Sequence, residues 1–141
     1  MQWFYAYRMS EPVEWRGLTV ADVMLRRPKA LPSSSTVGDV RAMLGNPSVQ
    51  MVLLADDGEF RGAITELPDE ASTDDEALGY ADQRPESIRP TEPASAGFEL
   101  TLRNPHRRVV VLDEHRALLG LLCLDRTRTR FCGHDSHRAT T

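Results

Sequence analysis

The chain has 141 residues, of which 40% are hydrophobic and 27% are charged, a composition typical of a folded protein with one core. Its formal net charge of −4 argues against nucleic-acid binding, because neutralising phosphates requires a basic surface. No apolar run approaches the roughly 20 residues that span a bilayer and the start lacks a basic signal-peptide region, so we expect a cytoplasmic protein without membrane contact.

Residues 1–17 form an N-terminal arm that is rich in aromatic side chains. Exposed together, these side chains would leave a costly apolar patch in water. We therefore expect the arm to pack on its own module, on a cleft or across a dimer. In a cleft it would replace a ligand. The aromatic residues of the arm are Trp3, Phe4, Tyr5, Tyr7 and Trp15.

Residues 18–68 predict a helix, a short strand, a second helix and a hairpin. Thr19 and Thr36 each precede an aspartate by three residues, which is the pattern of a capping box at a helix start. Asp57-Gly58 is a typical hairpin turn between two apolar runs. The expected elements are helices beginning at Thr19 and Thr36, an extended piece at 29–31 and hairpin strands at 50–55 and 60–65.

Residues 69–76 are acidic and are interpreted as a solvated connector, and residues 77–126 then repeat the first unit. Asn46-Pro47 recurs as Asn104-Pro105, and Gly62 recurs as Gly120, at one spacing of 58 residues. Two units that each leave an apolar sheet face open bury both faces by pairing. The second copy predicts a helix at 77–80, a strand at 88, a helix at 93–102 and hairpin strands at 109–112 and 118–123.

This order and repeat resemble the CBS domain family, whose members occur as tandem pairs called Bateman modules. The likeness spans roughly Leu18 to Asp125 and rests on TVADVM, RRPKALPSSSTVGDVRAML, VQMVLLADDGEFRGAIT and QRPESIRPTEPASAGFELTLRNPHRRVVVLDEHRALLGLL. It implies an α/β (α+β) fold of two βαββα repeats about a pseudo-twofold axis, with packed sheets and two clefts between the copies. It also implies a regulatory role, frequent homodimers, and in many members an adenosine-type ligand such as AMP, ATP or S-adenosylmethionine.

Ligand-binding members of the family typically end the second hairpin strand with Gly-x-x-Thr-x-x-Asp, which holds phosphate and ribose. The first copy keeps Thr65 but has Pro68 at the acid position, and the second copy has Cys123 for the Thr and Arg126 for the acid. The resemblance therefore implies a cleft with a weakened grip on the sugar. The candidate residues are Leu31, Thr36, Val52, Thr65, Asp69, Ile88, Arg107, Arg108, Val110, Cys123, Asp125 and Arg126.

Arg107 and Arg108 precede the central strand of the second copy, where family members often place a basic residue near phosphate. Arg126 is able to join them as a charge-assisted donor. If an anion binds, we expect it in this cleft. The alternative is that Arg107 and Arg108 are exposed at a strand edge, where charge discourages association between sheets.

The last segment, residues 127–141, is an Arg/His-rich tail with two competing interpretations. Cys132, His134 and His137, with Cys123 as a fourth ligand, are a chemically sensible zinc set. The spacing matches no standard finger, so a frayed end is the simpler interpretation. Two cysteines in so short a chain favour reduced thiols rather than a disulfide framework.

Catalysis is not indicated by the sequence. It contains no phosphate-binding glycine motif and places no Ser or Cys nucleophile beside His106 or His115. We therefore expect a stand-alone, non-enzymatic regulatory module that senses an adenosine-type ligand and signals through a homodimer or a partner protein. The alternative is a degenerate CBS pair that serves as a dimerisation or docking scaffold without nucleotide binding.

Overall fold

The computed structural model describes residues 16–127 and 130–132. The aromatic side chains predicted to pack as an N-terminal arm lie outside the described residues, as do His134 and His137 of the tail. None of the described helices is long and apolar enough to span a bilayer.

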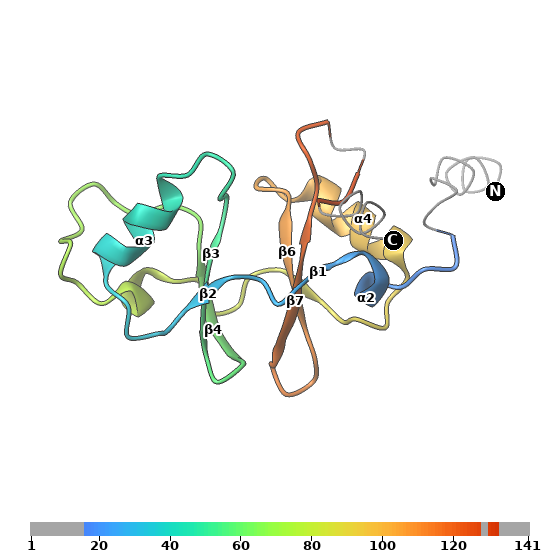
Figure 1. The fold of residues 1–141 in the computed structure, drawn as a ribbon, viewed down its shortest axis with the longest axis horizontal. Coiled ribbons are helices and arrows are strands. Elements are labelled where there is room, and N and C mark those ends of the chain that lie inside the picture. The colour runs from blue at the N-terminus through green and yellow to red at the C-terminus, as the bar shows by residue number, and fades with distance from the viewer. Residues whose placement is uncertain (1–15, 128–129, 133–141) are drawn as a thin grey trace.

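Two β-sheets pack face to face, and helices cover the outer side of each sheet (Figure 1). One sheet has the strand order β1-β7-β6-β5 and the other has the order β2-β3-β4. The expected α+β fold with packed sheets is confirmed. The elements are α2 (Val20–Val23), β1 (Leu25–Arg26), β2 (Ala30–Leu31), α3 (Val37–Leu44), β3 (Val52–Asp56), β4 (Glu59–Ile64), the 3-10 helix η2 (Ala77–Tyr80), β5 (Ser87–Ile88), α4 (Ala94–Arg103), β6 (Arg108–Leu112) and β7 (Leu118–Cys123).

The core between the sheets takes side chains from both of them. Leu53 and Phe60 come from the three-stranded sheet, and Val110 and Leu121 come from the four-stranded sheet. None of the four is more than 8% exposed. Burying a side chain of this size contributes about 1.5–3 kcal/mol, so this interface holds the two hairpins in a fixed relation.

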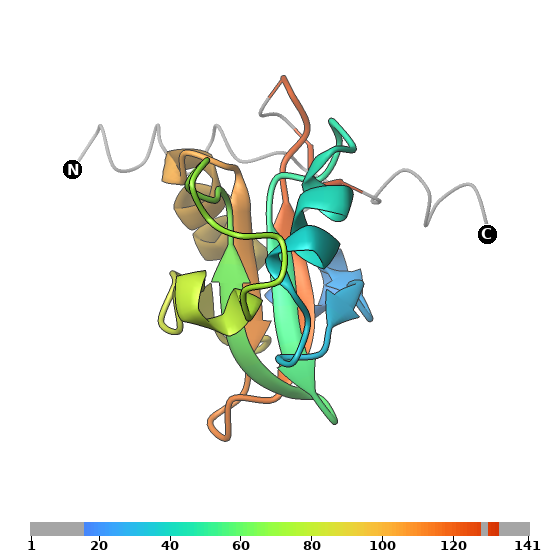
Figure 2. The same ribbon diagram turned by 90° about the vertical axis from the view of Figure 1, so that its left-hand side faces the viewer.

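The two hairpins are built alike, as the sequence repeat predicts. The first hairpin has a register shift between Leu54 and Ala55, and the second has one between Val111 and Leu112. In each sheet a two-residue strand pairs in parallel with the first hairpin strand, β2 with β3 and β5 with β6. The turns of both hairpins lie at the same end of the molecule (Figures 1 and 2).

The repeated Asn-Pro pair forms the same turn in both copies. The Asn46 side-chain oxygen accepts a hydrogen bond from the Ser48 N–H at 3.0 Å, and that of Asn104 accepts one from the His106 N–H at 2.9 Å. Asparagine is favoured in such turns because its side chain replaces a backbone acceptor. The motif therefore directs the chain from each helix into the first hairpin strand.

The opening elements of each sequence repeat pack against the other half of the molecule. Helix α2 contacts α4, and β1 pairs antiparallel with β7, so that Leu25 lies opposite Leu121 and Arg26 lies opposite Gly120. Ala77 of η2 is buried in the cluster of α3, β3 and β4. We call β2, α3, β3, β4 and η2 the first half, and the remaining elements the second half.

Both predicted capping boxes are present. The Asp39 carboxylate accepts from the Thr36 N–H at 3.0 Å, and the Asp39 N–H donates to the Thr36 hydroxyl at 3.3 Å. The Asp22 carboxylate accepts from the N–H and the hydroxyl of Thr19, which holds the pKa of Asp22 below its usual value. These contacts satisfy N–H groups that a helix start leaves unpaired, so α2 and α3 begin where the sequence predicts.

Candidate functional site

The predicted residues of the second copy meet where β6 begins and β7 ends. Arg108 pairs with Cys123 in the ladder between these strands. Arg107 has φ of 55° and donates through Nε to the Leu124 carbonyl at 3.3 Å, and Asp125 follows at once in the chain. The structure therefore brings four of the candidate residues, Arg107, Arg108, Cys123 and Asp125, to one end of the two central strands. We call this place, where β6 begins and β7 ends, the β6–β7 edge.

Arg108 is buried, and its guanidinium is occupied by main-chain carbonyls. Nη1 donates to the carbonyls of His106 at 3.3 Å and Arg107 at 3.1 Å, and Nη2 donates to that of Ser48 at 3.3 Å. Burial, followed by the charge of Arg107, holds the pKa of Arg108 below its usual value. Because Ser48 belongs to the first half, this side chain joins the two halves.

The expectation of reduced thiols is wrong, because Cys123 and Cys132 form a disulfide. The segment after β7 folds back on itself, and the Cys132 N–H donates to the Cys123 carbonyl at 2.6 Å. Two cysteines are too few for the framework of several disulfides found in small secreted domains. They are enough for one disulfide that closes a short loop. Cys123 therefore has no thiol to offer at the position of the family threonine.

The described part of the tail is docked rather than frayed. Phe131 is 2% exposed, packs in the core of the second half and meets Phe98 edge to face at 6.1 Å between ring centroids. The zinc hypothesis loses Cys123 and Cys132, because both sulfurs are in the disulfide. Within residues 16–127 and 130–132, no group of three or more His, Cys, Asp or Glu side chains is placed to hold a metal ion.

The predicted residues of the first copy are more dispersed. Thr36 caps α3, Thr65 is half-buried beyond β4, and Asp69 is exposed. Arg41 donates to the carbonyls of Pro68 at 3.0 Å and Asp69 at 3.4 Å, which ties this segment to α3.

The predicted apolar residues mostly serve the core. Val52 and Val110 are fully buried, while Leu31 and Ile88 are half-buried against the outer cores of the first and second halves. Arg126 is exposed beyond β7. The side chains accessible for an anion at the β6–β7 edge are therefore Arg107 and Arg126.

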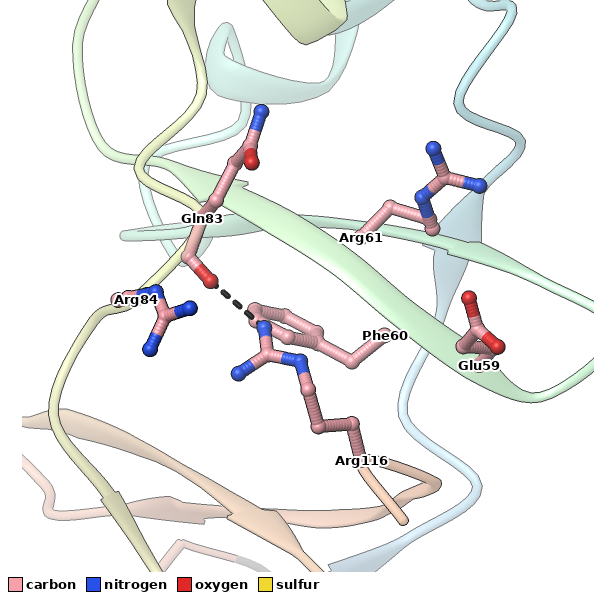
Figure 3. A pocket seen from close by; sticks show the side chains of 6 residues that line it. All are labelled: Glu59, Phe60, Arg61, Gln83, Arg84 and Arg116. Carbon is pink, nitrogen blue, oxygen red and sulfur yellow. Dashed lines mark hydrogen bonds between the residues drawn. The ribbon is translucent and has the colours of Figure 1, made fainter.

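A pocket of about 330 Å³ lies elsewhere, at the ends of the two hairpins, and we call it the hairpin-end pocket (Figure 3). None of its residues is among the sequence-predicted site residues, because they come from three segments that meet only in the folded chain. One feature of the sequence pointed to it, namely an arginine, Arg116, in the turn between the two strands of the second hairpin. The pocket is lined by Glu59, Phe60, Arg61, Gln83, Arg84 and Arg116.

Hydrogen bonds between the hairpins build this pocket. The Phe60 N–H donates to the Arg116 carbonyl at 2.9 Å, and the Leu118 N–H donates to the Gly58 carbonyl at 2.8 Å. The Arg116 guanidinium lies 5.5 Å from the centroid of the Phe60 ring and donates to the Gln83 carbonyl at 2.6 Å. A cation over an aromatic face is favourable, so Arg116 is held in place from two sides.

Solved structures share this arrangement of two halves. The CBS-pair protein CBSX2 from Arabidopsis thaliana superposes with a TM-score of 0.67 at 20% identity, over 88% of this chain and 97% of that chain. The chain has the fold of a CBS-domain pair. No family model matches it, and no curated protein does, so the CBS-pair likeness is one of structure.

Three structures with the CBS-pair fold contain adenosine compounds. CBSX2 has been crystallised with AMP, at a TM-score of 0.65, 19% identity and coverage of 89% of this chain and 100% of that one. A CBS domain protein from Pyrobaculum aerophilum, also with AMP, has a TM-score of 0.62 and 21% identity over 88% of this chain and all of its own. The CBS domain pair of MJ0100 is in complex with 5′-methylthioadenosine and S-adenosylmethionine. It has a TM-score of 0.59 and 15% identity, over 74% of this chain and 88% of that chain.

Proposed function

We propose that this CBS pair is a non-enzymatic regulatory module that binds an adenosine-type ligand between its halves. The observation that carries the proposal is the fold, because structures that share it at TM-scores of 0.59 to 0.65 hold AMP or S-adenosylmethionine. AMP, ATP and S-adenosylmethionine are the ligands to be tested first.

The β6–β7 edge is the place that we propose for the ligand phosphate. Arg107 is half-buried there, and Arg126 is exposed just beyond β7. Guanidinium groups suit this role because they donate paired hydrogen bonds to phosphate oxygens. Since Pro68 and Arg126 replace the family acids, we expect the affinity to depend on phosphate more than on ribose.

The link between the halves supplies a route for a signal. Arg108 is seated beside Arg107 and donates across the molecule to the Ser48 carbonyl. A ligand that draws Arg107 toward phosphate would change the surroundings of this contact. Such a ligand regulates only if it binds two conformations unequally. We propose that a homodimer or a protein partner reads the difference.

A scaffold without nucleotide is the second candidate, and specific observations favour it. The Arg108 guanidinium already donates hydrogen bonds to carbonyl oxygens, and the Cys123 sulfur is in the disulfide. Val52 and Val110 are packed in the core, so none of these four side chains is free to contact a ligand. A module of this kind would dimerise or dock a partner through its outer surface and would not respond to nucleotides.

Thermal melts with AMP, ATP, S-adenosylmethionine and adenosine separate the two candidates. A ligand that binds only the folded state raises the midpoint by mass action. For the sensor we expect AMP and ATP to raise it, adenosine to do so less, and Arg107→Gln with Arg126→Gln to remove most of the rise. Arg103→Gln is the matched control, since Arg103 is exposed in the last turn of α4. A flat response to every ligand identifies the scaffold.

A further inference from the structure

We propose that the hairpin-end pocket is a separate anion site, which takes the phosphoryl group of a small phosphorylated molecule and joins the two halves through it. Both hairpins turn at one end of the sheets (Figures 1 and 2), and residues at or next to these turns, such as Glu59 and Arg116, line the pocket. The β6–β7 edge proposed above is at the opposite ends of these strands, where β6 begins and β7 ends. The inference is therefore independent of the proposed adenosine site.

Two arginines converge on the pocket from different segments. In Figure 3 the guanidinium groups of Arg84 and Arg116 point toward one another beside the Phe60 ring. Arg84 comes from the segment between η2 and β5, and Arg116 comes from the turn between β6 and β7. A phosphoryl group placed between them would receive charge-assisted hydrogen bonds from both sides.

Arg116 is fixed before any ligand arrives. Its φ of 65° is in the left-handed region, which is uncommon for a residue with a side chain and is found most often where the surrounding structure enforces it. The backbone is held by the hydrogen bond that the Arg116 N–H donates to the Asp113 carbonyl at 3.1 Å within the turn and by the one that the Phe60 N–H donates to the Arg116 carbonyl. The side chain is held by its hydrogen bond to the Gln83 carbonyl. A donor already held in place loses less entropy on binding.

Arg84 supplies the second, uncommitted cation. Its backbone N–H donates to the Asp82 carboxylate at 2.9 Å, but no described residue accepts a hydrogen bond from its guanidinium. Arg61 differs, because it already pairs with Asp56 at 3.3 Å. The carboxylate of Glu59 also lines the pocket but lies on the other side of Phe60 from Arg84 in Figure 3. Among the described residues that line the pocket, Glu59 is the one acid, and it does not lie between Arg84 and Arg116 in this view.

The size and lining of the pocket define the class of ligand. A volume of about 330 Å³ is at the small end for ligand pockets. Around Phe60, which is 2% exposed, the remaining lining side chains are charged or amide groups. A compact ligand with two negative charges on one phosphoryl group fits this lining, whereas an apolar ligand would offer no acceptor to the Arg84 guanidinium.

A bound phosphoryl group would add a further link to the contacts that already join the two halves at this end. Phe60 belongs to the first half, Arg116 to the second half, and Arg84 to the segment that links them. Holding all three at once stabilises the juxtaposed hairpin turns. The site is thus suited to a metabolite whose concentration sets the rigidity of this end of the CBS pair.

Isothermal titration of the full chain with pyrophosphate at low ionic strength tests the proposal. We expect saturable binding that weakens by at least about tenfold in Arg84→Gln and in Arg116→Gln, because a hydrogen bond to a charged group is lost in each. Arg103→Gln, which changes an exposed residue in the last turn of α4, should bind pyrophosphate as the wild type does. Arg107→Gln removes any contribution of the β6–β7 edge and should leave binding at the hairpin-end pocket in place. Arg84→Gln is the decisive variant, since no residue in the described part of the chain accepts a hydrogen bond from this side chain and its loss should leave the fold intact.

Titrations with ADP and adenosine show which part of a phosphorylated molecule is recognised, and NMR shows where it binds. ADP binding as tightly as pyrophosphate while adenosine fails would indicate recognition of phosphate alone. Backbone amide shifts on titration should be centred on Phe60, Gln83 and Arg116. The proposal is overturned if pyrophosphate does not bind, if Arg84→Gln binds it unchanged, or if Arg107→Gln alone abolishes binding. That last result would place the anion at the β6–β7 edge and would support the adenosine site instead.

Discussion

The backbone carbonyl of Leu25 lies close against Gly120. A Cβ atom at position 120 would lie 2.8 Å from the Leu25 carbonyl oxygen and 2.8 Å from Met24 Cγ. The same relation recurs in the first half, where a Cβ at Gly62 would lie 2.8 Å from Ala81 Cβ. Each repeated glycine therefore admits the segment that leads into the other half, which is the physical reason for its recurrence 58 residues later.

Gly120→Ala is expected to destabilise the fold by about 1–3 kcal/mol, the usual cost of forcing a methyl group into a packed site. Met24 is able to shift, but the Leu25 carbonyl is held in the β1–β7 ladder. Urea unfolding gives the free energy of unfolding directly. Gly79→Ala is the matched control, because a Cβ at Gly79 meets nothing within 4 Å. Equal stability of the two variants would contradict the close crossing.

The sequence predicts the elements of the fold because each has a local cause. Thr36 and Asp39 cap α3, and Asp57-Gly58 forms the turn of the first hairpin. The sequence repeat predicts the elements of the second half from those of the first. The sequence does not predict that the first elements of each repeat, α2 with β1 and η2, pack against the other half of the molecule. Leu25 reaches β7 through a ladder between residues almost 100 positions apart, and such a pairing leaves no local pattern beyond an unexplained glycine.

The site was less predictable than the fold. Arg107 and Arg108 have identical side chains at adjacent positions, and only the fold buries Arg108 among carbonyls. The pairing of Cys123 with Cys132 depends on a tail that turns back. The hairpin-end pocket joins Arg84 to Arg116, and these residues come together through the packing of the two sheets rather than through any motif.

Arg108→Met should destabilise the protein by about 1–3 kcal/mol, since it removes the donor from several carbonyls, among them that of Leu124 in a buried position. Methionine keeps the apolar stem of the side chain, so the decrease in the free energy of unfolding measures the contribution of the hydrogen bonds. Urea unfolding of this variant is compared with that of Arg103→Met, whose side chain is exposed. If both variants unfold alike, the link between Arg108 and the first half contributes nothing.

Removing the disulfide should cost about 2–3 kcal/mol, as expected for a cross-link that closes a loop of about ten residues, because Cys123 and Cys132 are nine positions apart. Dithiothreitol should lower the urea midpoint of the wild type and leave the double variant Cys123→Ala/Cys132→Ala unaffected. The cytoplasmic location expected from the sequence is a reducing one, so thiol counts on protein from cell lysate show which state is populated. Two free thiols in non-reduced purified protein would contradict the disulfide.

Asp56 should make stability depend on pH in the acid range. The hydroxyl of Ser33 donates to its carboxylate at 2.6 Å and the Ser33 N–H donates at 3.0 Å, and these bonds hold the pKa of Asp56 below its usual value. A carboxyl whose pKa is lower in the folded chain than the unfolded value of about 3.9 stabilises the fold above that value, and the effect is lost as the pH falls through the folded pKa. The difference in urea midpoint between wild type and Asp56→Asn should therefore be constant from about pH 7 to pH 5 and shrink below about pH 4. Asp57→Asn, at the exposed neighbouring turn position, is the control. A difference that stays constant down to pH 3 would show that Ser33 does not favour the charged form of Asp56.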